Sequence, residues 1–384
     1  MKAAVLGYGT VGAGVYSMLS DAPGMEAGPV IVRPGKAVES FMVSDAALIF
    51  GDPTVDAVVE TLGGLDPAYS YGMRALEAGK HFITANKVMV ASHGLELAAL
   101  AREKGAAFLF SAACGGGVPF LHNLALSAET DRIEAVSGIL NGTTNYMLDA
   151  MQRRGLSYGD ALREAQSLGY AESDPTADVS GLDALRKMQL ACAVAFGVLP
   201  QSGMLCEGME HFTAADVEDI QSRGLVCRLM ARGSRAGESV SAYVEPVLFP
   251  RAAPESSVFT NNNMASYTGK RCGSIVLMGQ GAGRFPTASA VLRDLSAAQQ
   301  GARSMFPENC RAAEADNREA VHSYYIRTGG FAAVRLSLRS VLAQGEVVRA
   351  VTEPMSAEKM HALAQNIRKD GNDLFFAALE EELC

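Results

Sequence analysis

The part of this chain most suited to chemistry lies between residues 165 and 187. Four carboxylates and one lysine fall within its last 16 residues, although only 20% of the chain is charged; they are Glu172, Asp174, Asp178, Asp183 and Lys187. Asp183 and Lys187 are four residues apart, so a helix places them on one face, where the carboxylate can pair with the ammonium. Charged groups at the edge of a buried helix have shifted pKa values, which suits general acid–base chemistry.

A purely structural interpretation of the same residues is also open. Ser180 and Asp183 have the spacing of a capping box with aspartate in place of glutamate. Asp183 and Lys187 could form an ordinary intrahelical ion pair, worth about 0.2–0.5 kcal/mol. However, a nearly apolar run follows Lys187, and a lysine in such a buried setting is rare without a partner or a function. We therefore favour a chemical role for the pair.

The same stretch resembles the signature of the homoserine dehydrogenases. The shared features are a glycine–aromatic pair, an Asp-Pro, a following aspartate and a Gly-x-Asp-x-x-x-Lys run, here Gly169-Tyr170, Asp174-Pro175, Asp178 and residues 181–187. The resemblance extends over about residues 1–300. It implies reversible, NAD(P)H-dependent reduction of L-aspartate 4-semialdehyde to L-homoserine, a step of threonine, methionine and isoleucine biosynthesis.

The resemblance also implies a role for each side chain. Lys187 and Lys87 polarise the substrate oxygen and deliver a proton, while Asp183 positions Lys187 and holds it charged. Glu172 binds the α-ammonium of the substrate. An Asn-Gly-Thr turn and its neighbours complete the substrate site; these residues are Gly142, Thr143, Tyr170 and Asp178. Taken alone, the turn predicts only a helix that a threonine caps.

A short apolar strand at the start of the chain runs into a Gly-x-Gly-x-x-Gly motif formed by Gly7, Gly9 and Gly12. Glycines at this spacing let the backbone approach a pyrophosphate, and the helix that opens at Thr10 and Val11 supplies N–H donors. The alternative is a glycine-rich turn without a ligand. Because the motif directly follows a first strand, we favour a dinucleotide site.

The second strand is predicted at residues 29–32, and Arg33 follows it where NAD sites usually carry an acidic residue. A cation there can pair with a 2′-phosphate, so NADP(H) is the preferred cofactor and NAD(H) the alternative. A solvated arginine is the plainer interpretation. Residues 22–50 are few for this family, so we expect one helix–strand element to be trimmed.

Strands and helices alternate from residue 55 to residue 111, which indicates a mostly parallel, doubly wound sheet. Thr61 and Lys87 are predicted to end two of its strands, and ligands bind at such carboxyl ends. The resemblance places Lys87 next to both nicotinamide and substrate, although alone it would be an exposed strand-end lysine. It also places Gly281 at the cofactor, where residues 279–291 return to the first domain.

A second glycine-rich segment, residues 111–119, is predicted to open another helix. The resemblance implies a monovalent cation, Na+ or K+, held there by backbone oxygens of Ser111, Cys114, Gly116 and Val118. The family has a glutamate where Ser111 stands, so this chain lacks a charged ligand at that position. Cys114 as a nucleophile is a further alternative, but no base partner for it is evident.

Together these features predict an α/β protein with an N-terminal Rossmann-like, doubly wound parallel sheet. Residues 1–134, completed by 281–300, form the dinucleotide-binding domain, and residues 135–280 form an α+β domain for substrate binding and dimerisation. Residues 320–384 resemble a small, degenerate ligand-sensing domain of the ACT type, with a βαββαβ order. This tail is predicted to be one strand short, with a helix at 331–343.

The composition argues against several classes of protein. With a net charge of −9 and no basic patch, nucleic acid is not an expected partner. No apolar run reaches the roughly 18 residues of a membrane span, and no signal peptide is evident. The seven cysteines lack metal-like or staple-like spacing, so we expect a cytoplasmic protein with a small-molecule substrate. The resemblance implies a homodimer or a higher homo-oligomer.

Three alternatives to the favoured activity remain at this point. Another NAD(P)-dependent amino-acid oxidoreductase would share the N-terminal half but need not keep Glu172, Asp183 and Lys187 together. A catalytically silent NADP-binding sensor is compatible with the degenerate tail and with Ser111, although the intact acid–base set argues against it. A phosphorylating enzyme that oxidises aldehydes needs a cysteine with a histidine base, which Cys114 lacks.

Overall fold

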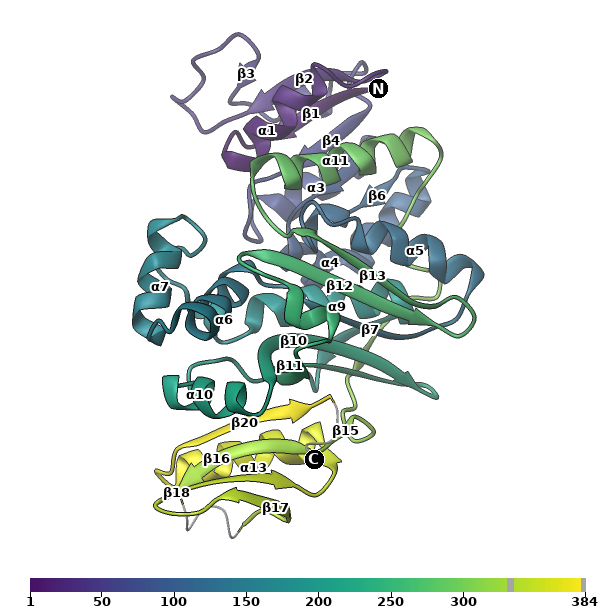
Figure 1. The fold of residues 1–384 in the computed structure, drawn as a ribbon. Coiled ribbons are helices and arrows are strands. Elements are labelled where there is room, and N and C mark those ends of the chain that lie inside the picture. Colours follow the sequence, from purple (N-terminus) through teal and green to yellow (C-terminus); the bar gives the residue numbers. More distant parts are fainter. Residues whose placement is uncertain (330–334, 381–384) are drawn as a thin grey trace.

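The computed structural model describes residues 1–329 and 335–380 (Figure 1). The chain begins in a sheet drawn in purple and blue, continues through a central layer of helices and long strands in teal and green, and ends in the yellow tail at the opposite end. Helix α11 (Arg284–Gln299), late in the sequence, lies against the first sheet beside helix α1. No helix in these two ranges is both long and apolar enough to cross a membrane.

The first sheet has six parallel strands in the order β3-β2-β1-β4-β5-β6. Strands β2 and β4 lie on either side of β1, so the strand order changes direction at β1. Ligands of doubly wound sheets bind at the carboxyl ends of the strands at such a point. Two helix pairs pack on the sheet, α1 with α11 and α3 with α4. The bounds are β1 Lys2–Leu6, β2 Glu26–Ile31, β3 Met42–Val43, β4 Ala57–Glu60, β5 His81–Thr84, β6 Phe108–Leu109, α1 Thr10–Leu19, α2 Ala47–Phe50, α3 Ala68–Glu77 and α4 Lys87–Lys104.

Two boundaries in this sheet differ from the prediction. The second strand starts at Glu26 and ends at Ile31, and no helix separates it from β3, so the trimmed element is that helix. The strand predicted to end at Lys87 stops at Thr84, because Asn86 caps helix α4 by accepting a hydrogen bond from Met89 N at 3.1 Å. Lys87 is therefore the first residue of α4.

The central layer surrounds one buried helix, α9 (Leu182–Phe196), which contacts strands β7, β10 and β11 and helices α4 and α5. Its apolar residues fix its position, so the first turns of α9 are held next to the start of α4. The other bounds are α5 Phe120–Thr130, β7 Ile133–Ile139, α6 Gly142–Arg154, α7 Tyr158–Ser167, α8 Thr176–Val179, β8 Val198–Ser202, β9 Leu205–Cys206, α10 Ala214–Ser222, β10 Leu225–Ala236, β11 Ser239–Pro250, β12 Asn262–Gly269, β13 Gly273–Gln280 and β14 Arg311–Glu314, with short 3-10 helices at Ser111–Ala113 and Pro254–Ser257.

The tail joins this layer instead of standing apart from it. Strand β20 pairs in parallel with β11 through Val247↔Ala378 and Leu248↔Leu379, so one sheet runs β13-β12-β7-β10-β11-β20-β16-β18-β17. The tail's bounds are β15 Val321–His322, β16 Tyr324–Gly329, β17 Leu338–Ala343, β18 Val347–Thr352, β19 Met355–Ser356, α13 Ala357–Lys369 and β20 Leu374–Leu379.

Two predictions for the tail need correction. Residues 338–343 form strand β17 and not the end of a helix, because they pair with β18 (Figure 1). The earlier part of that predicted helix, residues 331–334, lies outside the described residues. With β16, β17, β18 and β20 the tail has the four main strands of a βαββαβ order, so the prediction of a missing strand was wrong.

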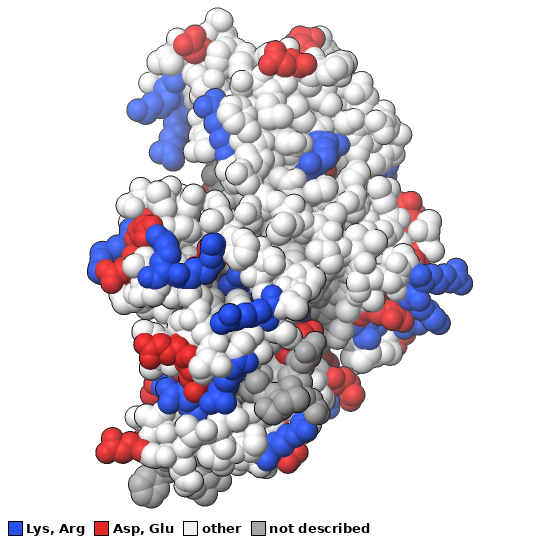
Figure 2. All heavy atoms as spheres, viewed as in Figure 1, with Lys and Arg blue, Asp and Glu red and all other residues white. Residues whose placement is uncertain are grey.

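The surface carries mixed charge. On the face shown in Figure 2, basic and acidic side chains are interspersed and form no continuous basic area. Six cysteines in the described part of the chain are free thiols: three are buried, two are partly buried, and only Cys272 is exposed.

Candidate active site

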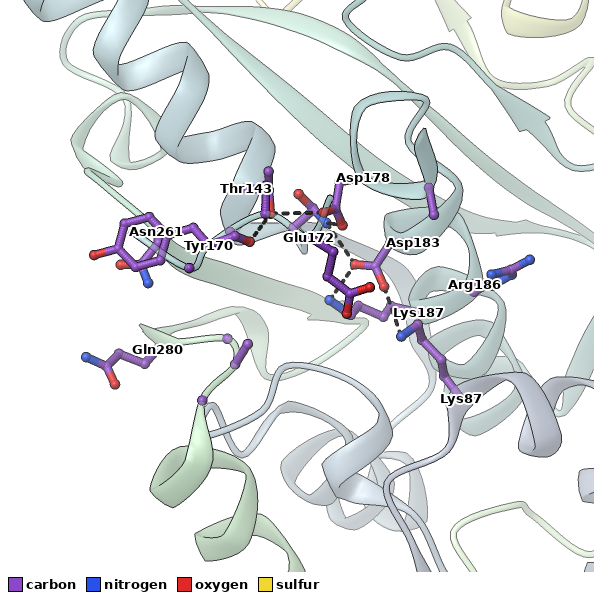
Figure 3. A pocket seen from close by; sticks show the side chains of 18 of the residues that line it. Lys87, Thr143, Tyr170, Glu172, Asp178, Asp183, Arg186, Lys187, Asn261 and Gln280 are labelled. Carbon is purple, nitrogen blue, oxygen red and sulfur yellow. Dashed lines mark hydrogen bonds and ion pairs between the residues drawn. The ribbon is translucent and has the colours of Figure 1, made fainter. Parts of the chain in front are cut away.

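A cavity of about 740 Å³ lies where the first turns of α9, the start of α4 and the loop before α11 meet (Figure 3). It is lined by nine of the predicted site residues: Lys87, Gly142, Thr143, Tyr170, Glu172, Asp178, Asp183, Lys187 and Gly281. These residues come from widely separated parts of the sequence. The structure therefore brings the predicted catalytic and substrate-binding residues together in one place.

On the wall of this cavity, the carboxylate of Asp183 lies between two lysines. Its Oδ2 is 2.7 Å from Lys187 Nζ and its Oδ1 is 3.1 Å from Lys87 Nζ. Lys187 Nζ also donates to the carbonyl oxygen of Leu140 at 2.6 Å. Two of the three Lys187 N–H groups are thus used inside the protein, and one is left for the cavity.

The capping interpretation of Asp183 was wrong. Helix α9 is preceded by Gly181, which has φ 82° and no side-chain cap, so Ser180 lies one residue too early to cap the helix. The left-handed conformation at Gly181 favours glycine. The Asp183 carboxylate is consequently free to bind the lysines.

Burial and charge oppose each other in this group. Burial alone would raise the pKa of Asp183, but Lys187 and Lys87 outweigh it and hold that pKa well below its usual range. For Lys187, burial would lower the pKa, and the attraction of Asp183 raises it above the ordinary value instead. At neutral pH, Asp183 is therefore ionised and Lys187 carries a proton that it can donate.

A second carboxylate, Asp178, lies beside the first. Asn141 Nδ2 bridges the two, at 2.7 Å from Asp178 Oδ1 and 2.9 Å from Asp183 Oδ2. The hydroxyl of Thr143 is 2.6 Å from the carbonyl oxygen of Tyr170 and 3.1 Å from Asp178 Oδ2. Burial raises the pKa of Asp178, and the charge of Asp183 adds to that effect. Asn141 and Thr143 thus hold the carboxylates of Asp178 and Asp183 in place on the wall of the cavity.

Glu172 occupies the open side of the cavity. Its side chain is exposed and has no hydrogen bond or ion pair to any described residue, and Figure 3 shows it directed into the cavity. Its backbone is tied to the preceding helix, because Gln166 Nε2 donates to the Glu172 carbonyl oxygen at 3.1 Å. An unpaired carboxylate in this place can accept hydrogen bonds from a ligand's ammonium group.

A second cavity, of about 1060 Å³, lies at the carboxyl ends of β1, β2 and β4. Four predicted cofactor residues line it: Gly7, Gly9, Arg33 and Thr61. Thr10, Val11 and Gly12 form the first turn of α1, which directly follows Gly9 in the chain. Lys87 and Gly281 line the first cavity instead. The predicted cofactor residues are therefore divided between the two cavities.

The glycine turn fits a dinucleotide. A Cβ on Gly12 would lie 2.1 Å from the carbonyl oxygen of Gly7, so only glycine allows this close packing, whereas nothing lies within 4 Å of a Cβ on Gly9. No side chain caps α1, so its first N–H groups are available to a phosphate. Arg33 is exposed at the end of β2 without a partner among the described residues, and Glu39 lines the same cavity.

The segment with the predicted cation ligands lines neither cavity. The carbonyl oxygens of Ser111 and Val118 accept hydrogen bonds from Cys114 N at 3.3 Å and Phe120 N at 2.8 Å. The described residues contain no cluster of three or more histidine, cysteine, aspartate and glutamate side chains that could hold a metal. Burial raises the pKa of Cys114 to about 12, which argues against its role as a nucleophile.

Three site residues were missed in the sequence. The Asn141 side chain caps α6 and bridges two carboxylates, although only its turn had been recognised. Buried Glu60 accepts hydrogen bonds from Leu62 N at 2.6 Å, from Gly63 N at 3.1 Å and from Thr84 Oγ1 at 2.5 Å, and so shapes the wall of the second cavity. Asn86 sets the start of α4. The available signal for Glu60 was its place at a strand end, beside Thr61.

Comparison with known proteins places this geometry in a family. The model described as "Homoserine dehydrogenase, NAD binding domain" matches residues 7–111, and the model described as "Homoserine dehydrogenase" matches residues 119–296. Homoserine dehydrogenases of Corynebacterium glutamicum and Bacillus subtilis are 38% and 34% identical, over 76% and 79% of this chain and 70% and 74% of their own.

Solved structures agree. A homoserine dehydrogenase from Thiobacillus denitrificans has a TM-score of 0.88 at 29% identity, over 99% of this chain and 98% of its own. A hyperthermophilic archaeal homoserine dehydrogenase in complex with NADPH shares the fold, with a TM-score of 0.67 at 24% identity over 81% of this chain and 99% of its own. The first of these matches spans the tail as well as the two cavities.

Proposed function

Because the chain belongs to the homoserine dehydrogenase family, we propose that Lys187, Lys87 and Asp183 catalyse the reversible reduction of L-aspartate 4-semialdehyde to L-homoserine. The chain is an NAD(P)-dependent oxidoreductase. The observation that carries the assignment of residues is the Asp183 carboxylate, which lies 2.7 Å from one lysine and 3.1 Å from the other at the edge of the first cavity.

The lysines supply the proton. When a nicotinamide cofactor is bound, the hydride for the aldehyde carbon would come from it, and the lysines would meet the negative charge that develops on the aldehyde oxygen. Lys187 still has one N–H for that oxygen, and among the described residues the Lys87 ammonium pairs only with Asp183. Either ammonium can therefore polarise the carbonyl and protonate the alkoxide. Asp183 keeps the Lys187 ammonium charged and holds both ammonium groups in place.

The remaining polar groups orient the substrate. Glu172, exposed and unpaired in the described part of the chain, suits the α-ammonium of aspartate semialdehyde. Asp178 and Thr143 form the adjoining wall, with Gly142 and Tyr170 at its ends. Replacing Glu172 with glutamine removes only the charge, so KM for homoserine should rise at least about ten-fold while kcat changes less. An unchanged KM would remove Glu172 from this role.

For the cofactor, we propose NADP(H) over NAD(H). Gly7, Gly9, Thr10, Val11 and Gly12 suit the pyrophosphate, and Arg33 at the end of β2 suits a 2′-phosphate. We assign Thr61, which lines the second cavity, and Lys87 and Gly281, which line the first, to the nicotinamide end.

Glu39 lines the same cavity as Arg33, and a carboxylate there suits the free 2′-hydroxyl of NAD. The ratio of kcat/KM with NADP to that with NAD should favour NADP in the wild type and fall at least about ten-fold in Arg33→Ala. Glu39→Ala is the matched control, and it should leave the ratio unchanged or raise it. A wild-type preference for NAD would overturn the assignment.

Three further properties belong to the same proposal. Residues 1–134 with 281–300 bind the dinucleotide, residues 135–280 bind substrate and mediate dimerisation, and residues 320–384 form the ACT-like tail. Support for a homodimer comes from β13, where the side chains of Val276 and Met278 are 48% and 62% exposed. Free thiols support a cytoplasmic location.

The proposal also includes a monovalent cation, Na+ or K+, held by backbone oxygens of Ser111, Cys114, Gly116 and Val118. Among the described residues, no N–H group of a loop or turn donates to the carbonyl oxygens of Cys114 and Gly116. Activity in buffers that contain only large organic cations, with and without added Na+ or K+, tests this. Equal rates in all three would exclude a functional cation.

A further inference from the structure

The Asn141 side chain lies between the two carboxylates of the site. Its Nδ2 is 2.7 Å from Asp178 Oδ1 and 2.9 Å from Asp183 Oδ2. We propose that Asn141 is a positioning residue that keeps both carboxylates ionised and aimed, Asp183 at the lysines and Asp178 at the substrate. This inference rests on the catalytic role proposed for Asp183 and on the substrate role proposed for Asp178.

The hydrogen bonds of Asn141 Oδ1 determine which end of the amide group faces the carboxylates. Asn141 Oδ1 accepts from Thr144 N at 2.8 Å and from Thr144 Oγ1 at 3.0 Å. Because Thr144 N can only donate, this end of the amide must be the oxygen, and the NH2 group must face the carboxylates. All four hydrogen-bonding capacities of the amide are therefore used, and its side chain is buried.

Two carboxylates this close would otherwise disfavour each other's charge. Burial and the charge of Asp183 raise the pKa of Asp178, whereas the hydrogen bonds from Asn141 and Thr143 oppose that rise. Asp183 has two lysines as counter-charges, but Asp178 has no ion pair in the described part of the chain. The amide is thus the main neutral donor that favours the ionised form of Asp178.

The charged groups around Asp178 come from three elements. Asp183, Arg186 and Lys187 belong to α9, Lys87 to α4, and Glu172 and Asp174 to the loop before α8, and all of them line the same cavity. The charge of Lys187 lowers the pKa of Asp178, but Lys187 is also paired with Asp183, and burial keeps the pKa of Asp178 above its usual value. Loss of the Asn141 donors should consequently move protonation of Asp178 to higher pH.

Asn141 also caps α6, so the test must separate the cap from the bridge. Asn141→Ser keeps an oxygen that can cap the helix but removes the two N–H donors. Asn317→Ala is the control: Asn317 is equally buried, accepts from Ala242 N at 3.0 Å and donates to Gly203 O at 2.7 Å, away from the cavity. It tests whether loss of any buried asparagine gives the same result.

The measurement is the pH dependence of kcat/KM for homoserine in wild type, Asn141→Ser and Asn317→Ala. We expect the acidic limb of the profile to move up by about one pH unit in Asn141→Ser, with a fall of at least ten-fold in kcat/KM near neutral pH. Asn317→Ala should keep the wild-type profile. An unshifted acidic limb in a folded Asn141→Ser would overturn the inference.

A second measurement does not depend on turnover. In protein with carbon-labelled aspartate, the carboxyl signal of Asp178, identified by its loss in Asp178→Asn, should titrate at higher pH in Asn141→Ser than in wild type. Equal titration in both proteins would overturn the inference even if the enzyme were inactive. Absence of homoserine turnover in the wild type would instead refute the proposed function.

Discussion

The role of Asp183 gives the sharpest prediction. Asp183→Asn keeps the shape of the side chain but removes the negative charge that lies 2.7 Å from Lys187 and 3.1 Å from Lys87. At an effective dielectric constant of about 20, these two attractions are about 6 and 5 kcal/mol before any cost of desolvation. Both Asp183 and Lys187 have side chains only 12% exposed, so water cannot replace the lost partner.

The net effect is smaller than these attractions but still large. Breaking a buried pair by removing one partner costs about 3–5 kcal/mol. We therefore expect the pKa of Lys187 to fall, because the charge of Asp183 no longer opposes burial, and its ammonium to lose its fixed position. Loss of a positioned proton donor lowers kcat by roughly 100- to 10,000-fold.

The assay is steady-state oxidation of homoserine with each cofactor, together with urea unfolding of the same proteins. Asp219→Asn is the matched control, because Asp219 forms an ion pair with Arg223 at 2.9 Å with the same four-residue spacing, far from the cavity. It should lose some stability and keep its kcat. If Asp183→Asn kept a kcat within about three-fold of wild type, the pair would be the plain structural ion pair considered at the outset.

Three further predictions concern other parts of the molecule. Burial raises the pKa of Asp294 to about 7, although Ser111 N and Oγ donate to it at 2.8 and 2.6 Å. Protonated Asp294 therefore stabilises the fold fully below about pH 4. This contribution is lost as the pH rises to about 7, by at most about 1.4 kcal/mol per pH unit. Urea unfolding at several pH values should show this fall in the free energy of unfolding in wild type and not in Asp294→Asn. In Gly12→Ala, the new Cβ would lie 2.1 Å from the Gly7 carbonyl oxygen and distort the glycine turn. Titration of NADPH followed by fluorescence should then show binding at least about ten-fold weaker. Unchanged binding would contradict the assignment of this turn to the pyrophosphate. Arg368→Ala removes two hydrogen bonds to Glu207, at 2.9 and 2.7 Å. The free energy of unfolding should fall by about 1–3 kcal/mol while kcat is retained. An unchanged free energy of unfolding would show that this link between the tail and the central layer contributes nothing to stability.

Local patterns were enough to predict the elements whose residues contact sequence neighbours. The glycine turn at Gly7–Gly12 and the i,i+4 pair of α9 depend on spacing along one strand or one helix, and both were recognised. Lys87 was placed near Lys187 only through the family resemblance, because no local pattern indicates that α4 and α9 lie side by side. The Asn141 bridge was missed for the same reason.

The errors also have physical causes. Residues 338–343 carry no strong period, and pairing with β18 makes them a strand, since strand propensity depends on neighbouring strands. The capping box at Ser180 failed because Gly181 adopts φ 82° and starts the helix one residue later. The union of the tail with the central sheet depends on the pairing of β20 with β11, which are far apart in sequence.

The most direct test of the account compares wild type with Lys187→Ala in homoserine oxidation, followed by the absorbance of the reduced nicotinamide with NADP and with NAD. The account predicts turnover by the wild type and a loss of at least about 100-fold in a variant that still binds NADPH. A Lys187→Ala protein that turns over homoserine at the wild-type rate would contradict the proposed chemistry. Wild-type protein that binds NADPH but does not oxidise homoserine would contradict the activity itself.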